Sequence, residues 1–213
     1  MKERPILFSA PMVRAILAGA KTVTRRIVSE RSPHWIVGER NDGVTWLMIA
    51  RDSVRGATNL DDDWLPMPCP YGDAGDRLRV RETWRTVERK PDMVDGILFR
   101  ADDAFVPIEN TRAAADRWID AHDNGKHSDR WRPSIFLPTW ASRIHLEVTD
   151  VRIERLHAID EHDAFAEGVS GWVLDPRCET ARDGFRVLWD EINGAGAWKE
   201  NPWVWRVGFR RLP

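Results

Sequence analysis

Short apolar runs separated by turn residues open the chain and predict a strand, a short helix and a second strand. The run PILF has the apolar content of a short strand. Pro11 suits the first turn of a helix, because its missing N–H would be unpaired there, and Gly19 is a typical helix end. The following KTVTRRIV is rich in β-branched residues and predicts a strand. In such a strand Lys21 and Thr24 share a side only if Lys21 still belongs to the turn.

In the middle of the chain, a segment with weak hydrophobic periodicity is followed by one that predicts turns and a strand. Residues 29–66 show weak periodicity and many turn formers, which predicts an irregular, partly extended excursion. In CPYGDAGDRLRVRETW, Gly72 and Gly75 predict tight turns ahead of a strand. Alternate positions of that strand share one face, which carries Leu78, Val80, Glu82 and Trp84.

Glu82 is unusual on this face, because a carboxylate among apolar side chains is costly to bury unless it is paired. One interpretation is an internal ion pair with an arginine such as Arg143. The other is that Glu82 lines a pocket and has a shifted pKa. The sequence leaves both interpretations open.

The next part of the chain predicts a peripheral insertion and then a long strand. Residues 85–130 include GILFRA, which is typical of a strand, and TRAAADRWIDAH, which is typical of a helix. The prolines of WRPSIFLPTWAS favour an extended segment. SRIHLEVTDVRIERL then predicts a strand whose apolar phase changes near Thr149 and Asp150, as at a β-bulge.

Two helices and a strand are predicted for the C-terminal part. Asp160 is a typical N-cap and Gly168 a typical end for the helix AIDEHDAFAEG. Glu167 then lies at the helix C-terminus, where a carboxylate opposes the helix dipole. WVWRVGF alternates as a strand does, and TARDGFRVLWDEIN carries an apolar stripe with helical spacing, formed by Phe185, Leu188, Trp189 and Ile192.

Together these elements predict an α+β fold, a small β-barrel with short flanking helices in one domain over residues 1–213. Residues 29–66 and 85–130 are expected to be peripheral excursions from it. The composition, 42% hydrophobic and 31% charged, is that of a soluble globular protein. No apolar run approaches the roughly 18 residues of a membrane span, and the N-terminus has too short an apolar run for a secretory signal. We therefore expect a cytoplasmic protein without a membrane partner.

Composition also limits the chemistry. The formal net charge of −2 argues against a polycation that binds DNA non-specifically. Cys69 and Cys178 are far apart and lack a CxxC pattern, so we predict two ordinary thiols. The six histidines show no metal-binding spacing, and we expect neither a metal nor a cofactor.

Arginine dominates the cations, and the chain has 12 tryptophans. Guanidinium groups suit phosphate contacts, and indole rings suit stacking on nucleobases. The same composition also arises from codon usage and from tryptophans packed in a core. Composition alone does not decide between these interpretations.

Five ordered blocks of the sequence resemble the ASCH-domain proteins found in phages and prophages. They are RPILFSAPMVRAILAGAKTVTRR, CPYGDAGDRLRVRETW, WRPSIFLPTWASRIHLEV, the AEG helix and the closing NPWVWRVGF. The resemblance covers nearly the whole chain apart from parts of 29–66, 85–130 and 170–180. It implies a PUA-like fold, a small barrel with a cleft beside the first helix, whose relatives bind RNA or modified bases.

The same superfamily includes small bacterial amidohydrolases that remove the acetyl group from N4-acetylcytidine, and proteins described as ribonucleases. In the deacetylases the catalytic residues are a lysine and a threonine in a GxKTxT stretch and a glutamate near the end of a later helix. By resemblance, GAKTVT supplies Lys21 and Thr24, and AEG supplies Glu167. This chain is larger than those enzymes, and its Arg25 and Arg26 differ from them and suit a phosphate-bearing substrate.

The first hypothesis is therefore hydrolysis of an acyl-amide on cytidine. Thr24 or a water attacks the carbonyl, Lys21 moves the proton and Glu167 orients Lys21. Burial must lower the pKa of Lys21 while a close carboxylate raises it. If Lys21 stays charged, it acts as an electrostatic clamp, and Glu82 or Glu167 is the base.

Two other functions stay open. One is a non-catalytic reader of RNA or a modified base, in which Trp84 or Trp140 stacks on the base and Arg25, Arg26 and Arg143 hold phosphates. The other is a metal-independent ribonuclease that uses Lys21, the arginines and a glutamate. In each case the expected partner is RNA or a modified nucleoside or nucleotide, with single-stranded DNA as a further option.

Overall fold

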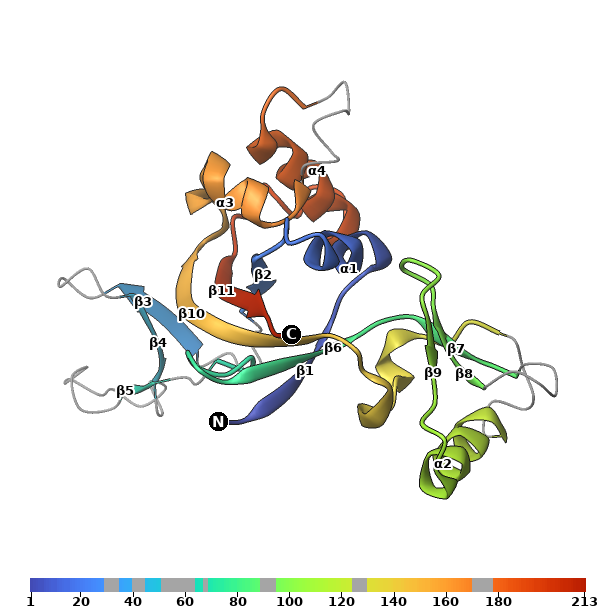
Figure 1. Ribbon diagram of the computed structural model, residues 1–213. Coiled ribbons are helices and arrows are strands. Elements are labelled where there is room, and N and C mark those ends of the chain that lie inside the picture. The colour runs from blue at the N-terminus through green and yellow to red at the C-terminus, as the bar shows by residue number, and fades with distance from the viewer. Residues whose placement is uncertain are drawn as a thin grey trace.

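A five-stranded sheet forms the centre of the molecule (Figure 1). The computed structural model describes residues 1–28, 35–39, 45–50, 64–66, 69–88, 95–123, 130–169 and 178–213. The strand order is β1-β6-β10-β11-β2, with β1 parallel to β6 and the other neighbours antiparallel. The bounds are β1 Glu3–Leu7, β2 Val23–Ile27, β6 Arg77–Arg81, β10 His145–Arg155 and β11 Trp203–Arg211.

The long strands β10 and β11 pair from Leu146 opposite Arg211 to Arg155 opposite Trp203. Their register shifts between Val148 and Asp150. The β-bulge predicted from the change of apolar phase is therefore confirmed. The bulge increases the bend of β10, which is the long curved strand of Figure 1.

Three helices gather on one side of this sheet (Figure 1). They are α1 over Ala10–Leu17, α3 over Glu161–Ala166 and α4 over Ala181–Asn193, and a 3₁₀ turn over Leu156–Ala158 precedes α3. Their ends follow the sequence signals, since Asp160 caps α3 by accepting from the backbone N–H of Asp163, and Gly19 and Gly168 have positive φ angles. The apolar stripe of α4 packs into the core except Ile192, which is 58% exposed.

The main core lies between these helices and the sheet. Apolar stripes at helical spacing meet the inward positions of the strands, which removes them from water. The buried side chains include Val13 and Ile16 of α1, Leu146 and Val148 of β10, and Phe185 and Trp189 of α4.

A second, smaller unit follows β6. The strands β7 Trp84–Val87, β8 Gly96–Phe99 and β9 Phe105–Pro107 form an antiparallel sheet, and α2 Arg112–Asp123 packs beside it. This unit has its own buried cluster, formed by Trp84, Ile97, Phe99, Trp118, Ala121, Leu137 and Ala141. The chain segment 85–130, which was predicted to be an insertion, thus contributes most of a separate core.

The strand predicted to run on through Glu82 to Trp84 instead breaks, so that part of the prediction was wrong. The strand β6 ends at Arg81 and β7 begins at Trp84. The reason is that Trp84 belongs to the second core, while Glu82 turns toward Arg143. The period-two pattern spans both strands and does not mark the break.

Two other segments also differ from expectation. Residues 29–66 were predicted to be an irregular, partly extended excursion. The extended parts are more regular than expected, since β3 Trp35–Glu39, β4 Thr45–Ala50 and β5 Trp64–Pro66 form an antiparallel sheet, and β4 lies next to β10. After Thr45 the run WLMIA is continuously apolar, so it lacks the alternation that marks a half-buried strand. The extended segment WRPSIFLPTWAS forms two 3₁₀ turns, Ser134–Phe136 and Thr139–Ala141, each preceded by a proline.

The predicted α+β class is confirmed. In the described part of the chain no ladder joins the edge strands β1 and β2, so the central sheet is open there and the barrel stays a prediction. No helix among the described residues is long and apolar enough to cross a membrane.

Replacing Gly168 at the end of α3 with any larger residue should destabilise the fold. Its φ is +86°, and an added Cβ would lie 2.9 Å from the Cβ of Ala15 and 3.1 Å from that of Lys21. We expect Gly168→Ala to reduce the free energy of unfolding by about 3 kcal/mol, because backbone strain and overpacking add. Urea denaturation measures this change.

Gly19→Ala is the matched control. Its φ is +73°, but nothing lies within 4 Å of an added Cβ, so only backbone strain remains. We expect a loss of about 1 kcal/mol. Equal losses in the two variants would contradict the close packing of α3 against α1.

Candidate functional site

The turn between α1 and β2 is tied to the end of α3. Lys21 and Glu167 form an isolated antiparallel β-bridge, and the Thr22 N–H donates to the carbonyl of Ala166 at 2.8 Å. Lys21 therefore precedes the strand, as the predicted turn requires. This places Lys21 and Thr24 on the wall of one cavity.

The ammonium group of Lys21 is enclosed by oxygen acceptors. Its Nζ lies 2.6 Å from Oε2 of Glu167, 2.8 Å from the carbonyl of Val23 and 2.9 Å from the carbonyl of Glu167. The lysine and the glutamate are each 3% exposed. Three acceptors match the three protons of an ammonium ion, whereas the lone pair of a neutral amine would face one of these oxygens. Lys21 is therefore charged in the resting state.

Burial also makes this lysine easier to deprotonate than a free one. Desolvation lowers the pKa of Lys21 below its ordinary value of 10.5, and the nearby Arg25 and Arg26 lower it further. Glu167 opposes these effects through its charge and its hydrogen bond, but does not cancel them. The result is an ammonium ion that loses its proton at a lower pH than a free lysine does.

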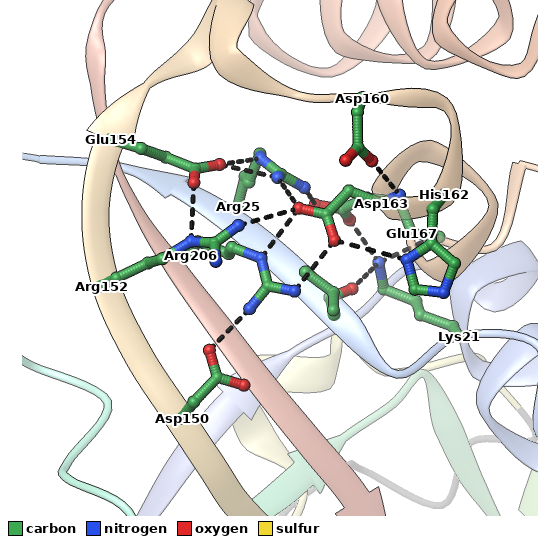
Figure 2. A network of polar contacts seen from close by, with 11 residues as sticks. Lys21, Arg25, Asp150, Arg152, Glu154, Asp160, His162, Asp163, Glu167 and Arg206 are labelled. Atoms are coloured by element: carbon green, nitrogen blue, oxygen red, sulfur yellow. Dashed lines mark hydrogen bonds and ion pairs between the residues drawn. The ribbon is translucent and has the colours of Figure 1, made fainter.

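Arg25 lies behind this pair and holds the other side of Glu167 (Figure 2). Its side chain is fully buried. The guanidinium contacts three carboxylates, with nitrogen–oxygen distances of 2.6 Å to Glu154, 2.5 Å to Asp163 and 3.2 Å to Glu167. These contacts occupy Arg25, so its geometry favours positioning Glu167 over holding a substrate phosphate.

Asp163 is the centre of the charge network behind the site. Arg206 donates two hydrogen bonds of 2.9 Å to it, and Arg152 approaches at 3.2 Å (Figure 2). The hydrogen bonds from Arg206 and Arg25 hold the pKa of this carboxyl well below its usual range, against the opposing effect of burial. The network fixes α3 on β2, β10 and β11, the elements that carry these arginines.

The cavity in front of the pair has a volume of about 170 Å³. It is smaller than the roughly 300–1,000 Å³ of drug-sized sites, so one ring with a small substituent suits it. One part of its wall is polar and charged, formed by Lys21, Thr24, Arg25, Arg26 and Glu167, with Asn193 as a further polar residue. The rest is apolar or aromatic, formed by Met12, Ile27, Tyr71, Phe185, Leu188, Trp189 and Ile192.

Two donors on these walls are buried without a hydrogen-bond partner among the described residues, the indole N–H of Trp189 and the Nε–H of Arg26. Thr24, which is 4% exposed, also lines the cavity, and its hydroxyl makes no hydrogen bond among the described residues. Buried donors normally have acceptors, and a bound ring with an oxygen or nitrogen acceptor can supply one.

Arg26 forms part of the rim. Its Nη2 donates to the carbonyl of Leu7 at 2.6 Å, and its guanidinium lies 5.3 Å from the ring centre of Phe8. Unlike Arg25, it makes no ion pair within the described residues. Arg26 is therefore the arginine of the pair that is available to an anionic substrate.

The other predicted substrate-binding residues lie elsewhere, since Glu82, Trp84, Trp140 and Arg143 do not line this cavity. Glu82 is 1% exposed and accepts from Arg143 at 2.7 and 2.9 Å, and Asp102 also accepts from that arginine. The predicted internal ion pair of Glu82 is therefore confirmed. Burial nevertheless raises the pKa of Glu82, as the second interpretation expected.

Sequence reasoning missed several residues of the site. Trp189 was assigned to the apolar stripe of a helix, and its indole N–H gives no sequence signal. Asp163 lies on the first turn of α3, where an acidic residue is ordinary, so its three arginine partners were not foreseen. Tyr71 and Asn193 come from distant parts of the chain and meet only in the folded protein.

One cluster in the described residues has the spacing of metal ligands, formed by Asp160, His162 and Asp163. Its carboxylates already have partners, since Asp160 caps α3 and Asp163 accepts from arginines. Positive guanidinium groups beside Asp163 oppose a cation. This cluster therefore does not favour a metal.

Comparisons of the chain with protein-family models, with curated proteins and with solved structures gave no match. The chemistry of the site and the resemblance of its motifs are thus the basis for inferring a function.

The contribution of the Asp163 carboxylate to the free energy of unfolding should depend on pH. A carboxyl with a depressed folded pKa stabilises the fold above its unfolded pKa near 3.9, and this contribution is lost as the pH falls toward the folded pKa. We expect Asp163→Asn to lower the free energy of unfolding by about 3 kcal/mol at pH 7, because buried Arg25 loses a partner.

Between pH 7 and pH 3, wild type should lose about 1 kcal/mol more stability than Asp163→Asn. Urea denaturation at the two pH values measures the difference. Glu179→Gln, at an exposed carboxylate, should follow wild type. Parallel pH dependences in wild type and Asp163→Asn would rule out the proposed linkage.

Proposed function

We propose that the chain is an amidohydrolase that removes an acyl group from the N4 amine of cytidine, in the manner of ASCH-domain deacetylases with a PUA-like fold. The observation that carries this proposal is the buried Lys21–Glu167 ion pair beside the unpartnered Thr24 hydroxyl on one cavity wall. Amide hydrolysis needs a base, a proton donor and an oxyanion donor, and these three groups can supply them. A cytoplasmic location is part of the proposal.

Water is the nucleophile that fits this site best. A threonine nucleophile needs a base within hydrogen-bond reach, and in the described residues the Thr24 hydroxyl has no such partner. Its free O–H is instead a donor for the acyl oxygen, where negative charge develops as the carbonyl carbon becomes tetrahedral. Thr24 thus stabilises the intermediate and forms no covalent bond.

Proton transfer is shared between Glu167 and Lys21. The Glu167 carboxylate takes a proton from the attacking water as the new C–O bond forms. Its protonation weakens the 2.6 Å bond to Nζ, which frees one N–H of Lys21 for the departing nitrogen. As the C–N bond breaks, the amine takes that proton, and the proton on Glu167 then returns to Lys21. Carboxylic acid and cytidine leave, and the ion pair is restored.

The cavity's size and polarity support a nucleobase as the bound ring. Its volume of about 170 Å³ accepts one ring and a short acyl group. The indole N–H of Trp189 can donate to a carbonyl of the base, which satisfies a donor that is otherwise unpaired. Arg26 at the rim can contact a phosphate, which favours a nucleotide or RNA over a free nucleoside.

A non-catalytic reader is the second candidate. The observation that favours it is that all three ammonium protons of Lys21 already have acceptors. Such a lysine can serve only to hold the turn against the end of α3, and the cavity would then bind a base without turnover. A ribonuclease would use the same residues, and cleavage of an RNA substrate would reveal it.

Two variants should separate catalysis from binding. We expect Lys21→Met and Thr24→Val each to reduce kcat for N4-acetylcytidine by about 10²-fold or more. Thr24→Val should leave stability within about 0.5 kcal/mol of wild type, because the lost hydroxyl has no partner in the described residues. Chromatographic detection of cytidine measures the rate, and circular dichroism checks folding.

Lys199→Met is the matched control, because Lys199 is exposed and outside the cavity. It should keep full activity. Full activity in a folded Lys21→Met or Thr24→Val variant would refute the assigned roles. Binding without turnover by wild type would instead select the reader.

The pH profile should report the ammonium form of Lys21. Because burial lowers its pKa, this proton donor is lost at a lower pH than a free lysine would lose it. We expect kcat to fall as the pH rises, with the fall beginning below pH 10.5 while the protein stays folded. A rate that instead rises through this range would contradict the donor role and assign the neutral amine as the base.

A further inference from the structure

A larger cavity lies in the second unit, beside β7 and α2. Its volume is about 550 Å³, within the range of roughly 300–1,000 Å³ that small-molecule sites occupy. Three tryptophans and a phenylalanine contribute to its walls, namely Trp84, Trp131, Trp140 and Phe136. Phe136 is 67% exposed and the neighbouring Ile135 is 55% exposed, so apolar surface faces solvent beside this cavity.

Each tryptophan of this cavity already lies beside a guanidinium group. The guanidinium carbon of Arg132 lies 4.8 Å from the ring centre of Trp84, and that of Arg117 lies 5.9 Å from the ring centre of Trp140. Two arginines lie over Trp131, Arg85 at 5.1 Å and Arg100 at 5.9 Å. Arg132 also donates to carbonyls of α2, and its backbone pairs with that of Trp84. These contacts order the rings in advance and surround them with positive charge.

One buried donor on the walls of this cavity has no acceptor among the described residues. Trp84 is 1% exposed, yet its indole N–H has no acceptor among the described residues. A buried donor of this kind is usually paired with an oxygen or a ring nitrogen. A ligand that stacks on the rings and also carries such an acceptor would complete the site.

A second cavity of about 260 Å³ continues this surface. Both cavities are lined by Arg117 and Trp140, so these two residues stand between them. The smaller cavity adds the apolar side chains of Ile97 and Val106, and Arg143 at its edge. Two adjacent cavities that share an indole and a guanidinium group offer room for more than one ring of a linear ligand.

We propose that this surface, lined by Phe136, Trp131, Trp140 and Arg117, binds single-stranded nucleic acid by stacking its bases. Nucleobases are flat and carry acceptors, and the backbone that links them is anionic. Stacking platforms with arginines between them are how proteins bind single strands with little sequence preference. The surface lies outside the Lys21 cavity, so the proposal does not depend on hydrolysis at that site.

The arginines decide between this ligand and the nearest alternative. Aromatic grooves also bind proline-rich peptides, but those ligands are uncharged along their backbone. The walls of the larger cavity carry two arginines, Arg117 and Arg132, and one acid, Asp120. Arg85 and Arg100 add two more guanidinium groups over the ring of Trp131, and the smaller cavity adds one arginine, Arg143, and one acid, Glu109. The excess of positive charge favours a polyanion.

The test is the binding of fluorescein-labelled ten-nucleotide strands, oligo(U) RNA and oligo(dT) DNA, measured by anisotropy with the full chain. We expect Phe136→Ala and Arg117→Gln each to weaken binding by about ten-fold or more. Both side chains are exposed, so folding should persist. Affinity should fall with added salt, and Arg117→Gln should reduce the slope of log K against log salt by about 0.7.

Matched controls lie outside the surface. Arg155 stacks on Trp203 with a ring-centre distance of 4.2 Å, and Phe165 of α3 is 51% exposed, but neither lines these cavities. Arg155→Gln and Phe165→Ala should therefore bind as wild type does. Hydrolysis of free N4-acetylcytidine, where present, should be unchanged in Phe136→Ala and Arg117→Gln, which separates this proposal from the function of the Lys21 cavity.

Binding of either strand with this pattern of variants supports the proposal, and a preference for RNA would point to contacts with the 2′-hydroxyl. No binding of either strand at low salt would overturn it. So would binding that survives both Phe136→Ala and Arg117→Gln. A salt-insensitive complex with a proline-rich peptide, lost in the same variants while the strands do not bind, would reassign the surface.

Discussion

The buried ion pair between Lys21 and Glu167 is the interaction on which the candidate site depends. Removing two charges from water is costly, and it is tolerated here because backbone carbonyls and Arg25 complete their hydrogen bonds. The pair also joins segments 146 residues apart in the sequence, the turn before β2 and the end of α3. Its position therefore follows from the packing of these elements, and the cavity lies where they meet.

The charge network behind the pair explains why this position is fixed. Arg25, Arg152 and Arg206 come from three strands of the central sheet and converge on Asp163 of α3. A network that is paired throughout holds its members in one geometry, while a partly paired one would be costly. The cavity walls carry two buried donors without a partner among the described residues, the indole N–H of Trp189 and the Nε–H of Arg26, and the Thr24 hydroxyl lines the same cavity. A ligand that carries acceptor atoms can pair with these donors.

Local signals in the sequence predicted much of the fold. Proline, glycine and an aspartate N-cap marked α1 and α3, and the change of apolar phase marked the bulge of β10, because these signals act over a few residues. The strand break at Glu82 was missed, because it depends on which core receives Trp84. Lys21, Thr24 and Glu167 could be named from short motifs, which are local signals. The partners of Arg25 and the role of Trp189 arise only from contacts between distant segments, so the sequence did not indicate them.

The most direct test of the proposed chemistry is mass spectrometry of the products formed from N4-acetylcytidine, free and within a short RNA, in water enriched in ¹⁸O. Hydrolysis of the amide predicts cytidine and an acetate that carries one ¹⁸O atom after a single turnover. Intact substrate, with the RNA still full length, would contradict hydrolysis at the Lys21–Glu167 pair.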